Sequence, residues 1–231
     1  MKKVYLVLIL LLFVGCDPVN EISIKNFDSI VDFTVLDPST GWKGGFSDCP
    51  EDTTGYNIKF SVENLPSSTE KSDEKGILLS GNNHSDDLWM FVSRKVAGLN
   101  PNTKYEGKMV LSLASKYLDG SVGIGGSPAN SVYVKAGIVG KNAEHIAYQG
   151  NYIFNLDKGN KAQGGTELKV MGDVAISGSV EEYKLITREL DQYSFTTNEY
   201  GEAWIVVGFD SGFEGTSSIY FHSLTLNFAA K

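Results

Sequence analysis

Cysteine is scarce in this chain of 231 residues, which contains only Cys16 and Cys49. If Cys16 is consumed by a modification, the remaining thiol has no partner in the chain, and no internal disulfide can stabilise the fold. A lone cysteine is more often a small buried apolar residue than a reactive nucleophile, and we expect this of Cys49. The fold must therefore be held by packing, or by packing and a metal.

Clusters of basic residues are also missing. The chain has 20 Lys and Arg against 28 Asp and Glu, a net charge of -8, and it has no run of Lys or Arg. Nucleic-acid binding needs a basic patch to meet the phosphates, so the composition argues against that function. The same acidic balance argues against anionic surfaces or anionic substrates as partners.

Motifs for nucleophilic catalysis and transition-metal binding are lacking as well. The sequence has no Gly-x-Ser-x-Gly, and its three histidines are far apart without a ligand-pair spacing. Oxygen-rich turns at 84–87 and 155–160 leave a structural calcium ion open. Asp210 and Glu214 could form a glycosidase pair, but acids in glycine-rich turns are common without catalysis. We therefore favour a protein that is not an enzyme.

Helical periodicity is nearly absent, whereas many short runs alternate between apolar and polar residues. Alternation with a period of two is typical of half-buried strands. The predicted strands lie around 30–36, 58–62, 76–79, 88–96, 104–113, 132–136, 152–156, 193–197, 203–207, 218–221 and 224–228. About ten strands separated by turn signals predict an all-β fold, a jelly-roll-like antiparallel β-sandwich. Residues 180–190 could hold a helical turn and fit a strand as well.

One turn has an informative sequence, GLNPNTKY at residues 98–105. Pro101 fixes φ, Asn102 tolerates a tight turn, and Thr103 and Tyr105 can bond the turn backbone. The segment resembles the corner of fibronectin type III domains and of galactose-binding-like jelly rolls, which include many carbohydrate-binding modules. Residues 218–226 are similar to the last strand of those jelly rolls. The resemblance, together with the length of the chain, implies the larger jelly roll.

The longest hydrophobic run is Val4–Val14, preceded by two lysines and followed by Gly15 and Cys16. Its eleven residues would cover roughly 16 Å as a helix, against about 30 Å of membrane hydrocarbon, so the run predicts a secretory signal peptide. LFVGC at residues 12–16 resembles the lipobox of bacterial lipoproteins, although Phe13 stands where Leu is usual. The resemblance implies cleavage before Cys16, lipidation of its thiol, and anchoring to a membrane of the cell envelope.

Three regions follow from this interpretation. They are a cleaved signal peptide (1–15), a tether (16–26) and a single β-sandwich domain (27–231). Because residues 1–15 contain two lysines and no acid, the mature chain has 28 acidic and 18 basic residues, a net charge near -10. The stretch GFDSGFEG at 208–215 resembles a segment of certain bacterial lipoproteins and brings no activity with it. The ligand, the particular membrane and the oligomeric state are not specified by the sequence.

Aromatic residues near acids are the candidates for ligand binding. Proteins bind sugars in water with apolar ring faces and a few polar side chains. The candidate residues are Trp42, Phe46, Asp86, Asp87, Asp210, Phe213 and Glu214. We expect Trp204, within a predicted strand, to be a core residue.

Three hypotheses cover these observations. The first is a lipid-anchored, non-catalytic β-sandwich that binds a glycan or another small polar ligand. The alternative is a structural or protein-interaction lipoprotein of the envelope. The third, which we favour least, is a glycoside hydrolase that uses Asp210 or Glu214.

Overall fold

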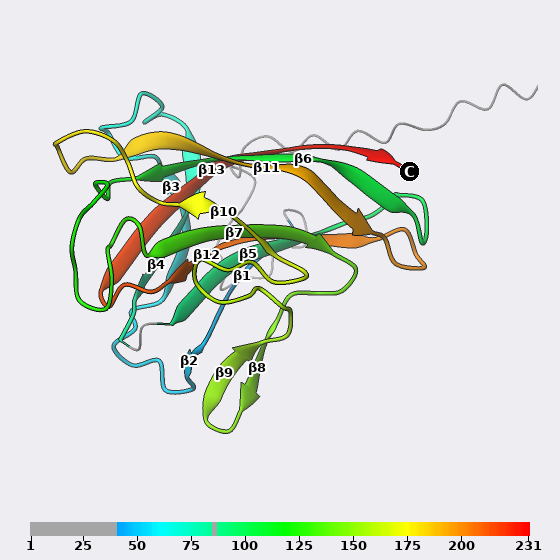
Figure 1. Ribbon diagram of the computed structural model, residues 1–231, viewed down its shortest axis with the longest axis horizontal. Helices are drawn as coiled ribbons and strands as arrows, with labels where there is room; N and C mark the ends of the chain where they lie inside the picture. Colours follow the sequence, from blue (N-terminus) through cyan, green and yellow to red (C-terminus); the bar gives the residue numbers. More distant parts are fainter. Residues whose placement is uncertain (1–40, 85–86) are drawn as a thin grey trace, which may run out of the picture.

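The computed structural model describes residues 41–84 and 87–231, and all regular elements in them are β-strands (Figure 1). No helix in these residues is long and apolar enough to cross a membrane. The predicted signal peptide, the lipidated Cys16, the tether, the strand at 30–36 and the candidate Asp86 lie outside the described residues. The all-β antiparallel sandwich predicted from the sequence is confirmed.

Two five-stranded antiparallel sheets form the two layers of the sandwich (Figure 1). The first sheet has the order β1 (Trp42–Ser47), β5 (Leu88–Val96), β12 (Ala203–Ser211), β7 (Val132–Val139) and β10 (Lys169–Asp173). The second has the order β11 (Lys184–Thr196), β6 (Lys104–Ser115), β13 (Thr216–Ala230), β4 (Lys75–Asn82) and β3 (Lys59–Asn64).

A small third sheet stands away from the two layers. It pairs β2 (Cys49–Pro50) with β9 (Asn151–Phe154) and β9 with β8 (His145–Tyr148). The β8–β9 hairpin projects from the lower edge of the sandwich in Figure 1. Cys49 in β2 is buried, which confirms its prediction as a buried residue, and burial raises the pKa of its thiol to about 11.

The strand predictions within the described residues are confirmed, with differences in extent. Residues 180–190 belong largely to strand β11, which also contains 193–196, and the two runs near the end of the chain form the single strand β13. Four strands were not predicted: β1, β2, β8 and β10. They are short or glycine-containing, so they lack a period-two pattern long enough to detect.

The main core fills the space between the sheets. The inward-facing residues of both layers form one apolar cluster that includes Leu79, Val92, Leu113, Val207 and Phe221. A second, smaller cluster lies on the other face of the first sheet and contains Trp89, Phe91, Leu156 and Leu168. Segment 140–168 therefore covers part of that face, which we call the outer face of the first sheet.

The predicted corner at 98–105 is confirmed. Asn102 has a φ of 50°, and the buried Tyr105 hydroxyl accepts a hydrogen bond from the Asn100 amide at 2.9 Å. The Thr103 hydroxyl donates to the Pro101 carbonyl at 2.9 Å. The corner thus fixes the turn that leads into β6, the central partner of β11 and β13.

We expect Tyr105→Phe to lower the free energy of unfolding by about 1–2 kcal/mol, because the Asn100 amide loses its acceptor in a part-buried site. Urea denaturation measures this as a lower midpoint with an unchanged slope. Tyr200→Phe is the matched control, since the Tyr200 side chain is 72% exposed. Equal midpoints for the two variants would show that the corner bond contributes nothing.

Candidate functional site

A buried cluster of five charged residues lies on the outer face of the first sheet. The Asp210 carboxylate on β12 is fully buried, and its Oδ2 accepts from Lys135 Nζ at 2.7 Å, Lys158 Nζ at 3.0 Å and the Lys161 amide at 2.9 Å. Lys158 Nζ also lies 3.0 Å from Asp48 Oδ2 and 4.0 Å from Asp87 Oδ1. Two ammonium groups therefore share three carboxylates, from the fully buried Asp210 to Asp87, whose side chain is 43% exposed.

The pKa shifts in this cluster follow from burial and charge. Burial raises the pKa of Asp48, and it raises the pKa of Asp87 to about 6. Burial also lowers the pKa of Lys135. Burial acts downward on Lys158 too, but the Asp210 and Asp48 carboxylates outweigh it, so the pKa of Lys158 is raised. Of the two lysines, Lys158 therefore holds its proton more strongly than Lys135 does.

A divalent metal does not fit this cluster well, although three carboxylates converge there. One oxygen from each of Asp48, Asp87 and Asp210 lies within 4.8 Å of the others, a spacing that calcium could bridge. However, Lys158 already lies among those oxygens and would repel a second cation. In the other calcium candidate, 155–160, both Asp157 oxygens accept hydrogen bonds, from the Gly159 and Thr166 amides.

The cluster fastens the covering segment to the sheet. Lys135 Nζ donates to the carbonyls of Lys158 at 3.0 Å and Gln163 at 3.1 Å in addition to Asp210. Its three N–H groups therefore all have acceptors. Asp210 was predicted to bind ligand or to act as a catalytic acid, and this is wrong, because its fully buried carboxylate binds two lysines instead. The structure brings the candidate Asp87 into the same cluster.

The predicted sugar platform at Trp42 is also wrong. Trp42 lies on β1, is only 5% exposed and packs into the main core, so it offers no ring face to a ligand. Phe46, on the same side of β1, is half-buried and stacks on His145 with ring centroids 5.1 Å apart. Residues 42–46 were expected to form a loop that displays both rings, but the segment is a strand whose alternation directs them toward the interior.

The candidate Phe213 lies at a different place, which we call the loop cavity. This cavity of about 330 Å³ is lined by Phe213 together with Tyr117, Leu118 and Pro128, and by Lys116, Ser121, Glu181, Thr216 and Ser218. Glu214 is half-buried next to Phe213, and its amide donates to the Ile124 carbonyl at 2.9 Å. The structure thus separates Phe213 and Glu214 from the charged cluster of Asp87 and Asp210.

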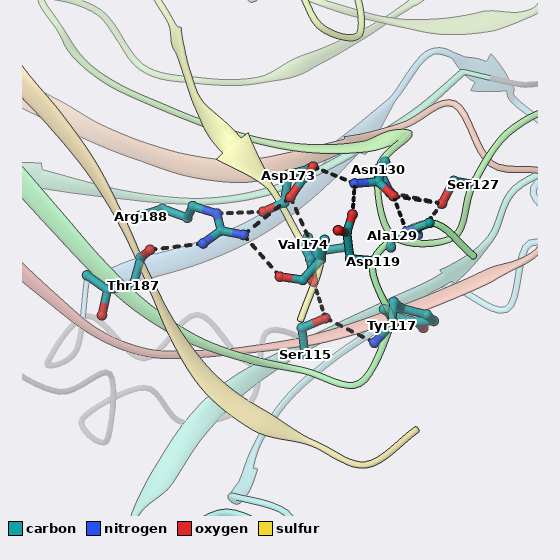
Figure 2. Close-up of polar contacts among 12 residues, drawn as sticks. Ser115, Tyr117, Asp119, Ser127, Ala129, Asn130, Asp173, Val174, Thr187 and Arg188 are labelled. Carbon is teal, nitrogen blue, oxygen red and sulfur yellow. Dashed lines mark hydrogen bonds and ion pairs between the residues drawn. The ribbon is translucent and has the colours of Figure 1, made fainter. Parts of the chain in front are cut away.

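A polar network holds the loop that borders this cavity (Figure 2). The Asn130 side-chain amide donates to Asp119 at 2.9 Å and to Asp173 at 3.0 Å, and Arg188 Nε donates to the Asp173 carbonyl at 2.7 Å. The Ser115 hydroxyl donates to the Val174 carbonyl. Contacts from β6, β10 and β11 therefore fix the loop between β6 and β7.

The polar groups of the loop cavity are largely engaged with one another. The Tyr117 hydroxyl donates to the Thr216 carbonyl and accepts from the Ser218 amide, and the Ser218 hydroxyl bonds Ser80 at 2.6 Å. Lys116 pairs with Glu181 at 3.5 Å. A glycan needs unengaged hydrogen-bond donors and acceptors beside an apolar face. This cavity therefore offers the aromatic ring of Phe213 but few polar groups that could bond a sugar.

A third site has both an aromatic ring and unengaged polar groups, and we call it the sheet groove. It consists of two cavities of about 350 and 260 Å³ on the outer face of the first sheet, which share Lys43, Ser93 and Asn142. The first is also lined by Gly41, Lys95 and Trp204. The second continues past Gly44, Gly45, Phe91, Ala143, Glu144 and His145.

The sheet register sets the floor of this groove. Lys43 on β1 pairs with Ser93 on β5, and Trp204 on β12 pairs with Lys95 on β5. Directly paired residues of antiparallel strands point to the same face, so these four side chains are neighbours. Among the residues that the structure describes, the Lys43 ammonium, the Ser93 hydroxyl and the Trp204 indole N–H have no hydrogen-bond partner.

Trp204 was expected to be a core residue, and this is wrong in part. It is half-buried and packs at the margin of the second apolar cluster, on the face opposite the main core. Alternation within Ala203–Val207 does separate it from its inward-facing neighbours Ala203 and Ile205. The period-two pattern therefore indicated that Trp204 points away from the main core, but it did not indicate that this end of the outer face would stay uncovered.

Comparisons with known proteins yield structural similarities only. No protein-family profile and no curated protein sequence matches the chain. Similar solved structures include tailspike protein 4 of bacteriophage CBA120 (12% identity, TM-score 0.37), with 81% of this chain and 19% of that chain covered.

Two carbohydrate-binding modules with β-sandwich folds are also similar. One belongs to the β-sandwich superfamily of carbohydrate-binding modules and is described as having promiscuous specificity (10% identity, TM-score 0.39, covering 80% of this chain and 56% of that one). The other is a family 61 module in complex with β-1,4-galactotriose (12% identity, TM-score 0.38, covering 80% and 86%). At these low values we infer function only from the side chains of this chain.

The raised pKa of Asp87 makes stability depend on pH. Between the usual value of 3.8 and about 6 the folded chain holds a proton that the unfolded chain releases. This contribution is full below pH 3.8 and is lost as the pH rises through about 6. We expect the unfolding free energy of wild type relative to Asp87→Asn to fall across that window in urea titrations. A pH-independent difference would contradict the assignment.

Proposed function

We propose that this chain is a lipid-anchored, non-catalytic module of the bacterial cell envelope that binds a glycan in the sheet groove. The observation that carries the proposal is the combination in that groove of a half-buried indole ring with three unengaged polar groups, from Lys43, Ser93 and Trp204. Sugar rings present apolar C–H faces and a rim of hydroxyls, which such a surface complements.

The position of the groove also favours binding. Its floor consists of β1, β5 and β12, which are consecutive in the sheet, and its wall is the segment after β7 that the charged cluster helps to hold. Sites on rigid strands lose less entropy on binding than sites on free loops. Two contiguous cavities further suit a chain of sugar units better than a single compact ligand.

Hydrolysis receives no support from the geometry of the candidate acids. Asp210 is fully buried and bonded to two lysines, and Glu214 is not among the carboxylates that meet Asp210 in the charged cluster. Retaining and inverting glycosidases need two accessible carboxyl groups about 5–9 Å apart across the substrate.

A protein-interaction function is the second candidate, and one observation favours it. Val122, Ile124 and Val180 are 93%, 72% and 58% exposed, and each is close in sequence to a residue that lines the loop cavity. Exposed aliphatic residues that gather near one cavity are typical of contact surfaces for another protein.

Lipid anchoring rests on the lipobox resemblance around Cys16 and has its own test. We expect the full-length protein expressed in bacteria to partition into the detergent phase of a Triton X-114 separation. Cys16→Ser should move it to the aqueous phase, because the variant lacks the thiol that lipidation requires and so lacks the two or more acyl chains that stable anchoring needs. Detergent partitioning that persists in the variant would contradict lipidation at Cys16.

Glycan binding is tested with Trp204→Ala. Covering about 60 Å² of the ring is worth roughly 1.5 kcal/mol, so we expect affinity for a bound glycan to fall about tenfold. A thermal-shift screen of neutral and acidic glycans first identifies a ligand, because a ligand that binds only the folded state raises the melting temperature. Isothermal titration calorimetry then measures its affinity for wild type and for Trp204→Ala.

The matched control is Phe213→Ala, which removes another half-buried aromatic ring, one that lines the loop cavity and not the sheet groove. We expect this variant to bind as wild type does. A glycan that binds wild type and Trp204→Ala equally well would exclude the sheet groove as its site. If no glycan binds wild type, the protein-interaction candidate takes precedence.

A further inference from the structure

Two lysines gather at one end of the sheet groove. Lys43 pairs with Ser93, and Lys95 lies two residues further along β5 on the same face, so their Cα atoms are diagonal neighbours about 7–8 Å apart. Trp204 stands directly opposite Lys95. The first cavity of the groove has no acidic residue among its described lining residues. This end of the groove is therefore locally cationic in a chain whose net charge is -8.

The two ammonium groups are differently engaged. Lys43 is exposed and forms no ion pair with a described residue. Lys95 Nζ donates to Glu202 at 2.9 Å, and its side chain remains 51% exposed. Since an ammonium carries three N–H donors, Lys95 keeps two for another acceptor. Glu202 thus positions Lys95 at the groove without using up its donors.

We propose that the sheet groove selects acidic glycans, with a uronic-acid carboxylate held by Lys43 and Lys95 while the sugar ring lies against Trp204. The inference rests on the proposed glycan binding and names the class of ligand. A carboxylate accepts hydrogen bonds from two donors at once, and charged hydrogen bonds are about twice as strong as neutral ones. The indole face and the Ser93 hydroxyl, together with Asn142, favour a sugar over an inorganic anion.

The acidic net charge of the whole chain does not oppose this arrangement. At physiological ionic strength the Debye length is about 8 Å, so charges farther away on the surface are largely screened. A carboxylate at the first cavity therefore interacts chiefly with nearby groups, which are the Lys43 and Lys95 ammonium groups and, with the opposite sign, Glu202. Glu144 lines the second cavity and not the first. Net charge is an average over the whole surface, so an acidic chain can still bind an anionic ligand at this patch.

The test compares acidic polysaccharides with their own uncharged forms. Polygalacturonate, alginate and hyaluronan are each titrated against wild type beside the carboxyl-reduced polymer, which keeps the ring and linkage and loses the charge. For at least one pair we expect the acidic form to bind about tenfold more tightly. This preference should shrink when the salt concentration is raised from about 0.02 M to about 0.5 M, because salt screens the attraction between the carboxylates and the lysines.

Lys43→Gln should abolish most of the preference, because the amide carries no charge, and should weaken binding of the reduced polymer less than binding of the acidic one. Lys59→Gln is the matched control, because Lys59 lies on β3 in the other sheet and pairs with Glu63 at 2.6 Å. Equal binding of acidic and reduced forms by wild type, or an unchanged preference in Lys43→Gln, would overturn the inference and leave glycan binding intact. Failure of every polymer, acidic or neutral, to bind wild type would instead contradict the proposed function itself.

Discussion

The arrangement of the outer face depends on one buried carboxylate. Asp210 Oδ2 receives hydrogen bonds from Lys135, Lys158 and the Lys161 amide, and Lys135 in turn bonds two carbonyls of the covering segment. Removing one partner of a buried ion pair typically costs about 3–5 kcal/mol, because the other charge is left without compensation. The segment held in this way supplies Asn142 and Glu144 to the wall of the sheet groove. The shape of the groove therefore depends on the Asp210–Lys135 ion pair, which lies outside the groove lining.

The two faces of the first sheet serve different purposes. The inner face packs against the second sheet, while the outer face is divided among a charged cluster, a small apolar cluster and an open groove. Phe91 marks the boundary, since it lies between Gly45 and Gly208 and also lines the groove. A Cβ at Gly45 would collide with the Phe91 ring, and a Cβ at Gly208 would collide with the Met90 carbonyl and the Trp89 ring, so both positions need glycine for these rings to pack on the sheet.

An aromatic ring alone does not identify a sugar site in this protein. Phe213 lines a cavity whose polar groups bond one another, whereas Trp204 lines a groove whose polar groups are unengaged. The difference is energetic, because a ligand that must break existing hydrogen bonds gains little from replacing them. The same consideration separates Asp210, whose Oδ2 already accepts three hydrogen bonds inside the protein, from Lys43, which faces the groove without a partner among the described residues.

The sequence by itself determined the fold class, most of the strands, the corner at Tyr105 and the buried state of Cys49, because these follow from local alternation and turn chemistry. It could not determine which outer-face residues are covered. Asp210 lies beneath segment 157–163 while Trp204, six residues earlier on the same strand and face, stays partly open. That outcome depends on where a segment distant along the chain crosses the sheet, and only the tertiary structure decided it. The same is true of the lysine pair at the groove, which strand register assembles from residues 43 and 95.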